Sequence, residues 1–398
     1  MSVVSEIDHW VFGALKNENV RDIKTTVVGG SVSGDGYTGT IVFVDVTAVA
    51  DNDEVREYSL AIKIAKRPPT EAELFHVAYV REMFVYDEIL TSFLTLLRAT
   101  VDFMPRCWTT ASTDTCDVIV FDNLKKQGYE LHDKMKSMNV NHIRLAMKAY
   151  ARWHGMSLAL RYLHPETFRK IEDTLSDEGF LKTIEGVWRN GKFDKVVSFS
   201  RDRWVKVLED DPDLLGKLQE KLGSQPVHVA DYIFDPPVKN QTVVNHGDCW
   251  NNNFLFKYGG QDKENPLKIA MLDFQIAVLH SPVRDLTHFL YSCASEHELS
   301  HMKEFIDLYY ESMSDLLRQL GCDPDEVFPR SWLADHWRKY SRYSFVMGNL
   351  VINLCFGKAE VFDDLSEMDL SCLLVEENEA ACAARIRALA RHFVEFEL

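Results

Sequence analysis

The sequence predicts a two-lobed α+β protein in which a small strand-rich part precedes a larger helical part. Two observations predict this plan: β-branched runs separated by glycines precede residue 66, and long helical patterns follow residue 140. The character of the chain changes near residue 123, so we expect lobes at 1–123 and 124–398. Ligands are then expected in the cleft between the lobes.

The N-terminal elements follow from residue type and spacing. An apolar group that includes Phe12 predicts a first helix, while β-branched runs flanked by glycine or proline predict strands. The expected elements, in order, are helix 1–24, strands 25–28, 40–46 and 58–65, helix 71–98 and strand 116–121.

Beyond residue 123 the apolar spacing is mostly helical. Helices are expected at 140–163, 178–190, 201–222, 296–320 and 330–356. A strand-like stretch at 242–274 interrupts them, and its apolar runs end in polar residues that do not belong in a core. The chemistry is therefore expected in that stretch.

Composition excludes several classes of protein. The chain of 398 residues carries 44 basic and 61 acidic side chains, a net charge of −17, which disfavours nucleic-acid and acidic-membrane partners. The eight cysteines form no CxxC pair and are expected to be reduced core thiols. With an acidic start and no apolar run of about 18 residues, we expect a soluble, cytoplasmic protein.

Asp248, Asn253 and Asp273 are the main candidates for catalysis. Asp248 and Asn253 have the D-x-x-x-x-N spacing of the kinase catalytic loop, and Asp273 begins a D-F-x tripeptide. In phosphoryl transfer a carboxylate accepts the proton of the attacking hydroxyl, and oxygen ligands hold Mg²⁺ on the phosphates. Each residue alone is typical of a turn, but the ordered set indicates a phosphotransferase.

Upstream residues fit the same chemistry, each with a simpler alternative. Lys63 lies on the third strand, where it would reach phosphates, although a lysine in such a strand is often a solvated edge residue. Glu82 would hold Lys63 by an ion pair, or lie on a helix surface. Gly34 and Gly36 would let a hairpin tip approach phosphates, or simply form a turn.

Taken together, these motifs resemble the ecdysteroid kinase-like family of small-molecule kinases, which is related to choline and aminoglycoside kinases. The Asn-His-Gly-Asp-x-Trp segment at 245–250 and Asp-Phe-Gln at 273–275 are the most specific parts. The other matching segments are Gly34–Tyr37, Lys63, Glu82 with Tyr86, Val120–Leu124, Gly128–Tyr129, Trp153–His154 and Ser281–Leu286.

The resemblance implies a protein-kinase-like fold, ATP with Mg²⁺, and phosphorylation of an alcohol. By position, it makes Asp248 the catalytic base, Asn253 and Asp273 metal ligands, and Lys63 a phosphate contact positioned by Glu82. Backbone groups around Phe121, Asn123 and Leu124 would hold adenine. Asp285 and His246 would brace the catalytic loop, and His154 is expected to be a structural core residue.

A small-molecule acceptor is expected rather than a protein. His246-Gly247-Asp248 replaces H-R-D, only eleven residues separate Asp273 from Asp285, and no A-P-E follows. Little room is left for a peptide-docking activation loop. Aromatic residues in 331–356 would wall an apolar acceptor pocket or, equally, pack as core.

An ecdysteroid is the leading acceptor, followed by a xenobiotic alcohol or a choline-like cation. The competing reading is a catalytically silent, kinase-shaped binding protein for a hydrophobic ligand. Loss of a catalytic residue would favour it, and none is lost. The sequence names neither the acceptor hydroxyl nor the oligomeric state.

Overall fold

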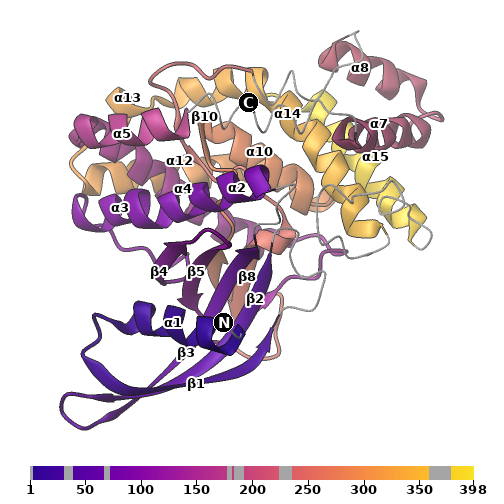
Figure 1. Ribbon diagram of the computed structural model, residues 1–398. Coiled ribbons are helices and arrows are strands. Elements are labelled where there is room, and N and C mark those ends of the chain that lie inside the picture. The colour runs from indigo at the N-terminus through magenta and orange to yellow at the C-terminus, as the bar shows by residue number, and fades with distance from the viewer. Residues whose placement is uncertain are drawn as a thin grey trace.

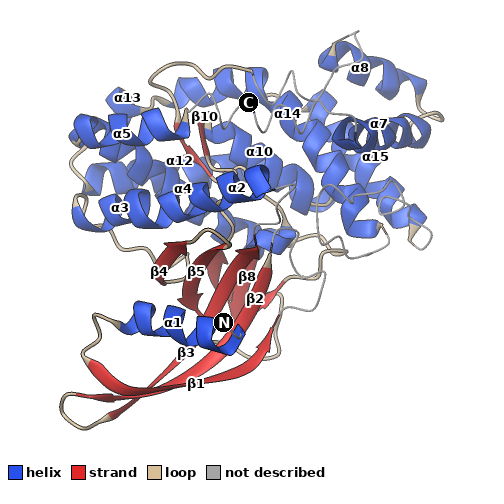
Figure 2. Ribbon diagram, viewed as in Figure 1, coloured by secondary structure: helices blue, strands red, loops and turns tan. Residues whose placement is uncertain are grey.

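The N-terminal strands form one antiparallel sheet of five strands in the order β1-β2-β3-β5-β4 (Figures 1 and 2). The computed structural model describes residues 3–30, 39–66, 72–176, 182, 192–223, 235–357 and 378–398. The strands are β1 (Val20–Gly30), β2 (Thr40–Ala50), β3 (Val55–Lys66), β4 (Cys107–Ser112) and β5 (Cys116–Asp122). β4 was not predicted, and the other strands extend beyond the predicted ranges.

The first helix is shorter than predicted. Helix α1 (Val3–Leu15) buries Trp10 and Val11 against one face of the sheet, but the prediction that it continues to residue 24 is wrong. Asn19 has a φ of 52°, a left-handed conformation that a helix does not continue through, and Val20 then pairs with β2. Phe12, expected on the apolar side, is 64% exposed.

A continuous helical segment joins β3 to β4. It consists of α2 (Ala72–Phe84), the π-helical turn η1 (Val85–Leu90) and α3 (Thr91–Thr95), which agrees with the helix predicted over 71–98. In Figure 1, α2 and α3 lie along the helical part of the molecule, above the sheet. Tyr86 and Phe93 of this segment belong to the large core that the helical part shares.

The C-terminal part is mostly helical. Its helices are α4 (Val140–Leu163), α5 (Pro165–Leu175), α7 (Lys192–Val207), α8 (Pro212–Leu222), α10 (Pro282–Cys293), α11 (Glu296–Leu299), α12 (Met302–Gln319), α13 (Pro324–Val327), α14 (Arg330–Phe356) and α15 (Glu379–Glu395). The helices predicted at 140–163 and 330–356 are confirmed, and α5, α10 and α15 were missed. The helix predicted at 178–190 lies outside the described residues.

The helix predicted over 201–222 is two helices, because α8 starts with its own N-cap. The Asp211 side chain accepts a hydrogen bond from the Leu214 N–H, and Pro212 has no N–H to continue a preceding helix. The predicted helix at 296–320 is likewise divided into α11 and α12.

Short strands in the helical part carry the segments with polar ends. β6 (Tyr129–Leu131), β8 (Phe254–Tyr258) and β9 (Pro266–Met271) form one small antiparallel sheet, while β7 (Val243–Asn245) pairs with β10 (Val278–His280). The two-lobed α+β plan is confirmed. The boundary at residue 123, just after β5, stays a prediction.

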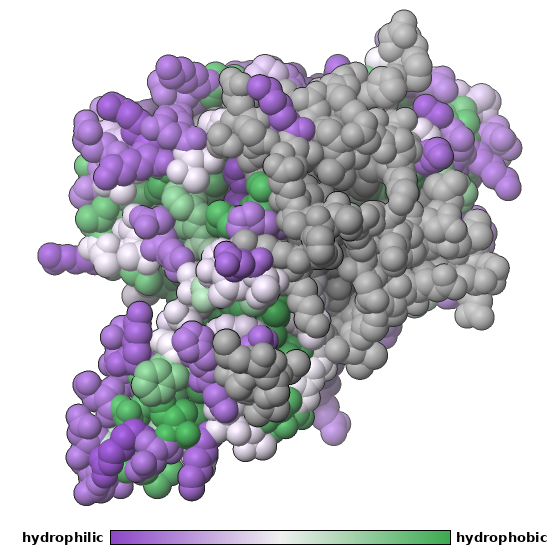
Figure 3. All heavy atoms as spheres, viewed as in Figure 1, coloured by the Kyte–Doolittle hydropathy of each residue, from purple (hydrophilic) through white to green (hydrophobic). Residues whose placement is uncertain are grey.

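The described surface is largely hydrophilic (Figure 3) and the described cysteines are unpaired, as the charge and the cysteine spacing of the sequence predicted. In Figure 3, hydrophilic side chains dominate much of the described surface, and hydrophobic ones gather on part of the sheet lobe. Seven cysteines lie in the described ranges; none of these forms a disulfide, and all but Cys107 are buried. No helix in the same ranges has the length and apolar character needed to cross a membrane.

Candidate functional site

A cavity lies where the sheet, the connection after β5 and the polar segments of the helical part meet. The structure places Lys63, Glu82, Phe121, Asn123, Asp248, Asn253 and Asp273 in its lining. Other lining residues are Gly39, Ile41, Phe43, Leu124, Lys125, Trp250 and Leu272. Gly34 and Gly36 lie outside the described residues. All the other residues that we predicted for the site therefore share one cavity.

Lys63 is an internal lysine between two carboxylates. β3 is the central strand of the sheet; Ile62 and Ile64 face the α1 side, so alternation turns Lys63 toward the cavity. Its Nζ lies 2.6 Å from Glu82 Oε2 and 2.9 Å from Asp273 Oδ1. Burial alone would lower the pKa of Lys63, but the two carboxylates raise it above its ordinary value. The alternative of a solvated edge lysine does not hold.

Glu82 is 1% exposed, so it is not a surface helix residue. Burial raises the pKa of Glu82 to about 7, against the opposing effect of the Lys63 ammonium. The backbone of Phe274 also donates a hydrogen bond to its carboxylate. Glu82 thus joins α2 to both Lys63 and the segment that carries Asp273.

Asp248 is held at one carboxylate oxygen. The Asn253 Nδ2 donates to Asp248 Oδ2 at 2.8 Å and to its carbonyl oxygen at 2.9 Å, and the Trp250 Nε1 donates to Oδ2 at 3.3 Å. Burial and the charge of Asp273 raise the pKa of Asp248 to about 7, although both hydrogen bonds oppose this. The sequence showed Trp250 only as part of the Asn-His-Gly-Asp-x-Trp motif, and its position two residues after Asp248 did not predict this hydrogen bond.

Strand pairing brings Asn253 and Asp273 together. Asn253 ends a 3₁₀ turn just before β8, and Asp273 follows β9, whose Met271 pairs with Phe254. The Leu272 N–H donates to the carbonyl oxygen of Asn253 at 2.9 Å. Asp273 has a φ of 66°, a left-handed conformation that Asp tolerates better than most residues. The amide and the carboxylate therefore lie at one edge of the small sheet.

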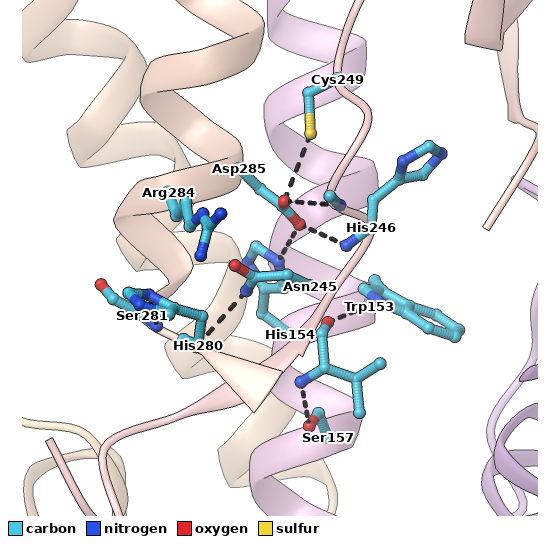
Figure 4. Close-up of polar contacts among 12 residues, drawn as sticks. Trp153, His154, Ser157, Asn245, His246, Cys249, His280, Ser281, Arg284 and Asp285 are labelled. Atoms are coloured by element: carbon cyan, nitrogen blue, oxygen red, sulfur yellow. Dashed lines mark hydrogen bonds and ion pairs between the residues drawn. The ribbon is translucent and has the colours of Figure 1, made fainter. Parts of the chain in front are cut away.

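Asp285 fixes the backbone just before Asp248 (Figure 4). Its Oδ2 accepts the His246 backbone N–H at 2.7 Å, and its Oδ1 accepts the Gly247 N–H at 3.0 Å. His154 Nε2 donates to Oδ2 at 3.1 Å. Burial would raise the pKa of Asp285, but the hydrogen bond and charge of His154, with the His246 N–H, hold it below its ordinary value. His154 is structural, as expected, and acts directly on this brace.

The His246 ring links the two acidic segments. Its Nδ1 accepts the Asp248 N–H at 3.2 Å, so Nε2 carries the proton and donates to the carbonyl oxygen of Leu272 at 2.7 Å. Burial lowers the pKa of His246, which keeps the ring neutral. Behind it, Trp153 Nε1 and Ser157 Oγ bond the carbonyl and N–H of Val244. Residues 244–248 are therefore fixed by α4 and α10.

Comparison with known protein families gives a match over most of the chain. The model of the ecdysteroid kinase-like family matches residues 33–322, which is more than half of the chain and includes all the site residues named above. The chain belongs to the ecdysteroid kinase-like family. No curated protein matches the chain.

The two-lobed architecture is the kinase-like α+β fold expected of an ecdysteroid kinase-like protein. Family membership makes it kinase-like in general chemistry: such proteins are small-molecule phosphotransferases that use ATP with Mg²⁺. The acidic cavity edge, with Asp273 and Asn253 side by side, offers the oxygen ligands that Mg²⁺ prefers.

The donor set fits a metal ion shared with a nucleotide rather than an all-protein metal cage. No group of three or more His, Cys, Asp or Glu side chains suited to a metal occurs within the residues the structure describes. Mg²⁺ commonly takes one or two protein ligands and completes its shell with phosphate oxygens and water. One carboxylate and one amide oxygen match that pattern.

The aromatic residues of α14 in this ecdysteroid kinase-like protein are mainly core. Phe345 is buried against Trp204 and Phe393, with ring centroids 5.9 Å and 4.8 Å away, and Trp337 packs on Phe396. None of the α14 aromatics lines the cavity described above. Of the two alternatives, core packing describes Phe345 and Trp337.

Proposed function

We propose that this ecdysteroid kinase-like protein transfers the terminal phosphoryl group of ATP to a hydroxyl group of a small molecule. The observation that carries the proposal is the convergence of Lys63, Glu82, Asp248, Asn253 and Asp273 on one cavity. A binding protein would not need a buried lysine between two carboxylates next to a third carboxylate of raised pKa.

In this proposal Asp248 is the base. Its Oδ2 accepts hydrogen bonds from Asn253 and Trp250, so Oδ1 is the oxygen left to accept the proton of the acceptor hydroxyl. As that proton leaves, the hydroxyl oxygen bonds to phosphorus and the bond to the ADP oxygen breaks. A pKa of about 7 suits a group that must take a proton and release it near neutral pH.

The nucleotide is proposed to lie along the sheet. Lys63 would contact its phosphates, and Glu82 would keep Lys63 in place. Bound Mg²⁺, held by Asp273 and Asn253, would neutralise phosphate charge. Adenine would lie beside Phe121 and Asn123, where the Leu124 N–H has no hydrogen-bond partner within the described residues and is available to it.

The acceptor is proposed to be an ecdysteroid or a related steroid alcohol, on family grounds. The experiment is ADP release with MgATP across ecdysteroids, other sterols, plant-derived alcohols, choline and aminoglycosides, with mass spectrometry of the products. A gain of one phosphate on a single class identifies the substrate. A phosphorylated xenobiotic or choline, with ecdysteroids unchanged, would replace the steroid assignment and keep the kinase.

Thermal unfolding with and without MgATP separates the kinase from a silent binding protein. A ligand that binds only the folded state raises the melting temperature. No shift at millimolar MgATP, together with no product from any acceptor, would favour the binding protein. A shift without product would mean that the acceptor lies outside the panel.

A further inference from the structure

Arg81, which precedes Glu82 in α2, makes contacts that the catalytic scheme above does not use. It is 6% exposed. Its Nη1 donates to the carbonyl oxygen of Ala277 at 2.8 Å and to that of Leu175 at 3.1 Å. A buried guanidinium therefore joins α2 to two distant segments: the one around Ala277, 196 residues away along the chain, and the one around Leu175, 94 residues away.

The first of these segments carries one of the proposed metal ligands. Ala277 follows Asp273 by four residues, and its N–H donates to the Phe274 carbonyl oxygen at 3.1 Å, which closes the segment into a turn. Ile276 lies directly against Gly247: a Cβ added at Gly247 would be 2.4 Å from the carbonyl oxygen of Ile276. A contact that fixes Ala277 therefore also restrains the turn that carries Asp273 and, through Ile276, the backbone next to Asp248.

The second segment is the end of α5. Leu175 is the last residue of that helix, and the last carbonyls of a helix have no partner inside it. They also carry partial negative charge, so a cation there is favourable. Arg81 thus joins α2 to the end of α5 in the helical lobe as well as to the turn at 273–277.

α2 is fastened to the sheet at a different point. His76 Nδ1 lies 2.8 Å from Asp117 Oδ2, on β5. Arg81 holds the C-terminal half of the helix to the helical lobe, one residue from Glu82. Glu82 therefore lies in the part of α2 that contacts the helical lobe, whereas His76 contacts the sheet.

From these contacts we infer that Arg81 is a positioning residue: it fastens α2 to the turn at 273–277 and to the end of α5, and so holds Glu82 against Lys63. A guanidinium suits this task because one of its two NH2 groups can donate to two carbonyl oxygens at once, as Nη1 does here. The role deepens the proposed function, since Lys63 is its proposed phosphate contact.

The test reads the state of Lys63 directly, in the protein without nucleotide. Wild type, Arg81→Met and Glu82→Gln are exposed briefly to acetic anhydride, and acetylation of Lys63 is quantified by mass spectrometry. Acetylation requires Lys63 to leave its two carboxylate partners and reach solvent, so its extent reports how firmly Glu82 and Asp273 hold the side chain. We expect acetylation to rise about tenfold in Arg81→Met, because the hydrogen bond from Lys63 to the Glu82 carboxylate is lost.

A double variant distinguishes positioning from general loosening. If Arg81 acts through Glu82, the Arg81→Met change adds little acetylation when Glu82→Gln is already present. Arg169→Met, on the exposed side of α5, is the matched control and should leave Lys63 as in wild type. Arg81→Lys keeps the charge and should restore part of the protection. Arg81→Gln, which lacks the charge, takes the place of Arg81→Met if the latter does not fold.

Unchanged acetylation of Lys63 in Arg81→Met, or in Arg81→Gln if only that variant folds, would overturn the inference, as would equal increments with and without Glu82→Gln. MgATP binding to wild type is measured by calorimetry on the same samples. Absent nucleotide binding with the expected acetylation pattern would reject the proposed function and leave the role of Arg81 standing. Nucleotide binding with unchanged acetylation would reject the role of Arg81 and leave the proposed function standing.

Discussion

Asn253 donates from one amide nitrogen to both the carbonyl oxygen and Oδ2 of Asp248, at 2.9 Å and 2.8 Å. The pair is five residues apart, and the intervening 3₁₀ turn at Asn251–Asn253 makes the contact local. One side chain therefore orients the proposed base while its own oxygen remains available for a metal ion. The D-x-x-x-x-N spacing corresponds to this geometry.

Asp248→Asn should nearly abolish phosphoryl transfer and leave nucleotide affinity close to wild type. The amide keeps the shape of the side chain but cannot accept the acceptor proton, and loss of a general base lowers kcat by about 10²–10⁴-fold. Turnover is measured with the acceptor found in the panel, and MgATP affinity by calorimetry. Wild-type turnover in this variant would remove Asp248 from the mechanism.

Asp273→Asn should weaken binding of the Mg²⁺–nucleotide complex. A charged ligand is lost, a change of about 1.5–3 kcal/mol for such a hydrogen-bonded charged group, or roughly 10–100-fold in affinity. Calorimetry with MgATP and with metal-free ATP checks this, because only the former should weaken strongly. Equal losses in both would assign Asp273 to holding Lys63 rather than metal.

The stability of the nucleotide-free protein should depend on pH through Asp248. Burial raises its pKa from 3.8 to about 7, so the folded state favours the protonated carboxyl. That contribution to the free energy of unfolding is complete below about pH 4 and is lost as the pH rises to about 7. Asp248→Asn has no carboxyl to ionise and does not lose this stability. The melting temperature of the variant minus that of wild type should therefore increase as the pH rises from about 4 to about 7.

Thermal unfolding at pH values from about 4 to 8 measures this difference. Asp114→Asn, an exposed position in the β4–β5 connection, is the control and should show no such trend. A constant difference between Asp248→Asn and wild type would show that the Asp248 carboxyl is not perturbed in the folded protein.

Gly247→Ala should impair both folding and catalysis. Gly247 has a φ of 90°, and an added Cβ would lie 2.4 Å from the Ile276 carbonyl oxygen. Gly321→Ala is matched, since Gly321 has a φ of 82° with open space around it. We expect a loss of about 1 kcal/mol in unfolding free energy at Gly321, without loss of activity, and a larger loss at Gly247.

Chemical denaturation and turnover of the two glycine variants test this expectation. Equal stabilities would mean that the backbone near Ile276 moves aside at little energy. Retained turnover in Gly247→Ala would show that the segment before Asp248 tolerates that movement.

The sequence alone determined the two-lobed plan, the family resemblance and the main charged residues of the site. Periodicity and glycine positions predicted α4, α14 and the strands that carry Lys63 and Phe121, because these elements are long or strongly patterned. Short elements such as β4 and β6 were missed, since three to six residues carry little periodicity. β6 in addition pairs only with β8, which is far away along the chain. Helix 1–24 was overextended because apolar spacing did not register the left-handed turn at Asn19.

Only the tertiary structure decided which distant side chains touch. Lys63 and Asp273 are 210 residues apart and form an ion pair of 2.9 Å, and His154 reaches Asp285 across 131 residues. Arg81 had no sequence signal, because a lone arginine in a helix is typical of a solvated face. Local patterns report which face of an element is buried, whereas the partner that faces it depends on how all the elements pack. The motif order therefore predicted the chemistry, and packing determined the residues that hold it in place.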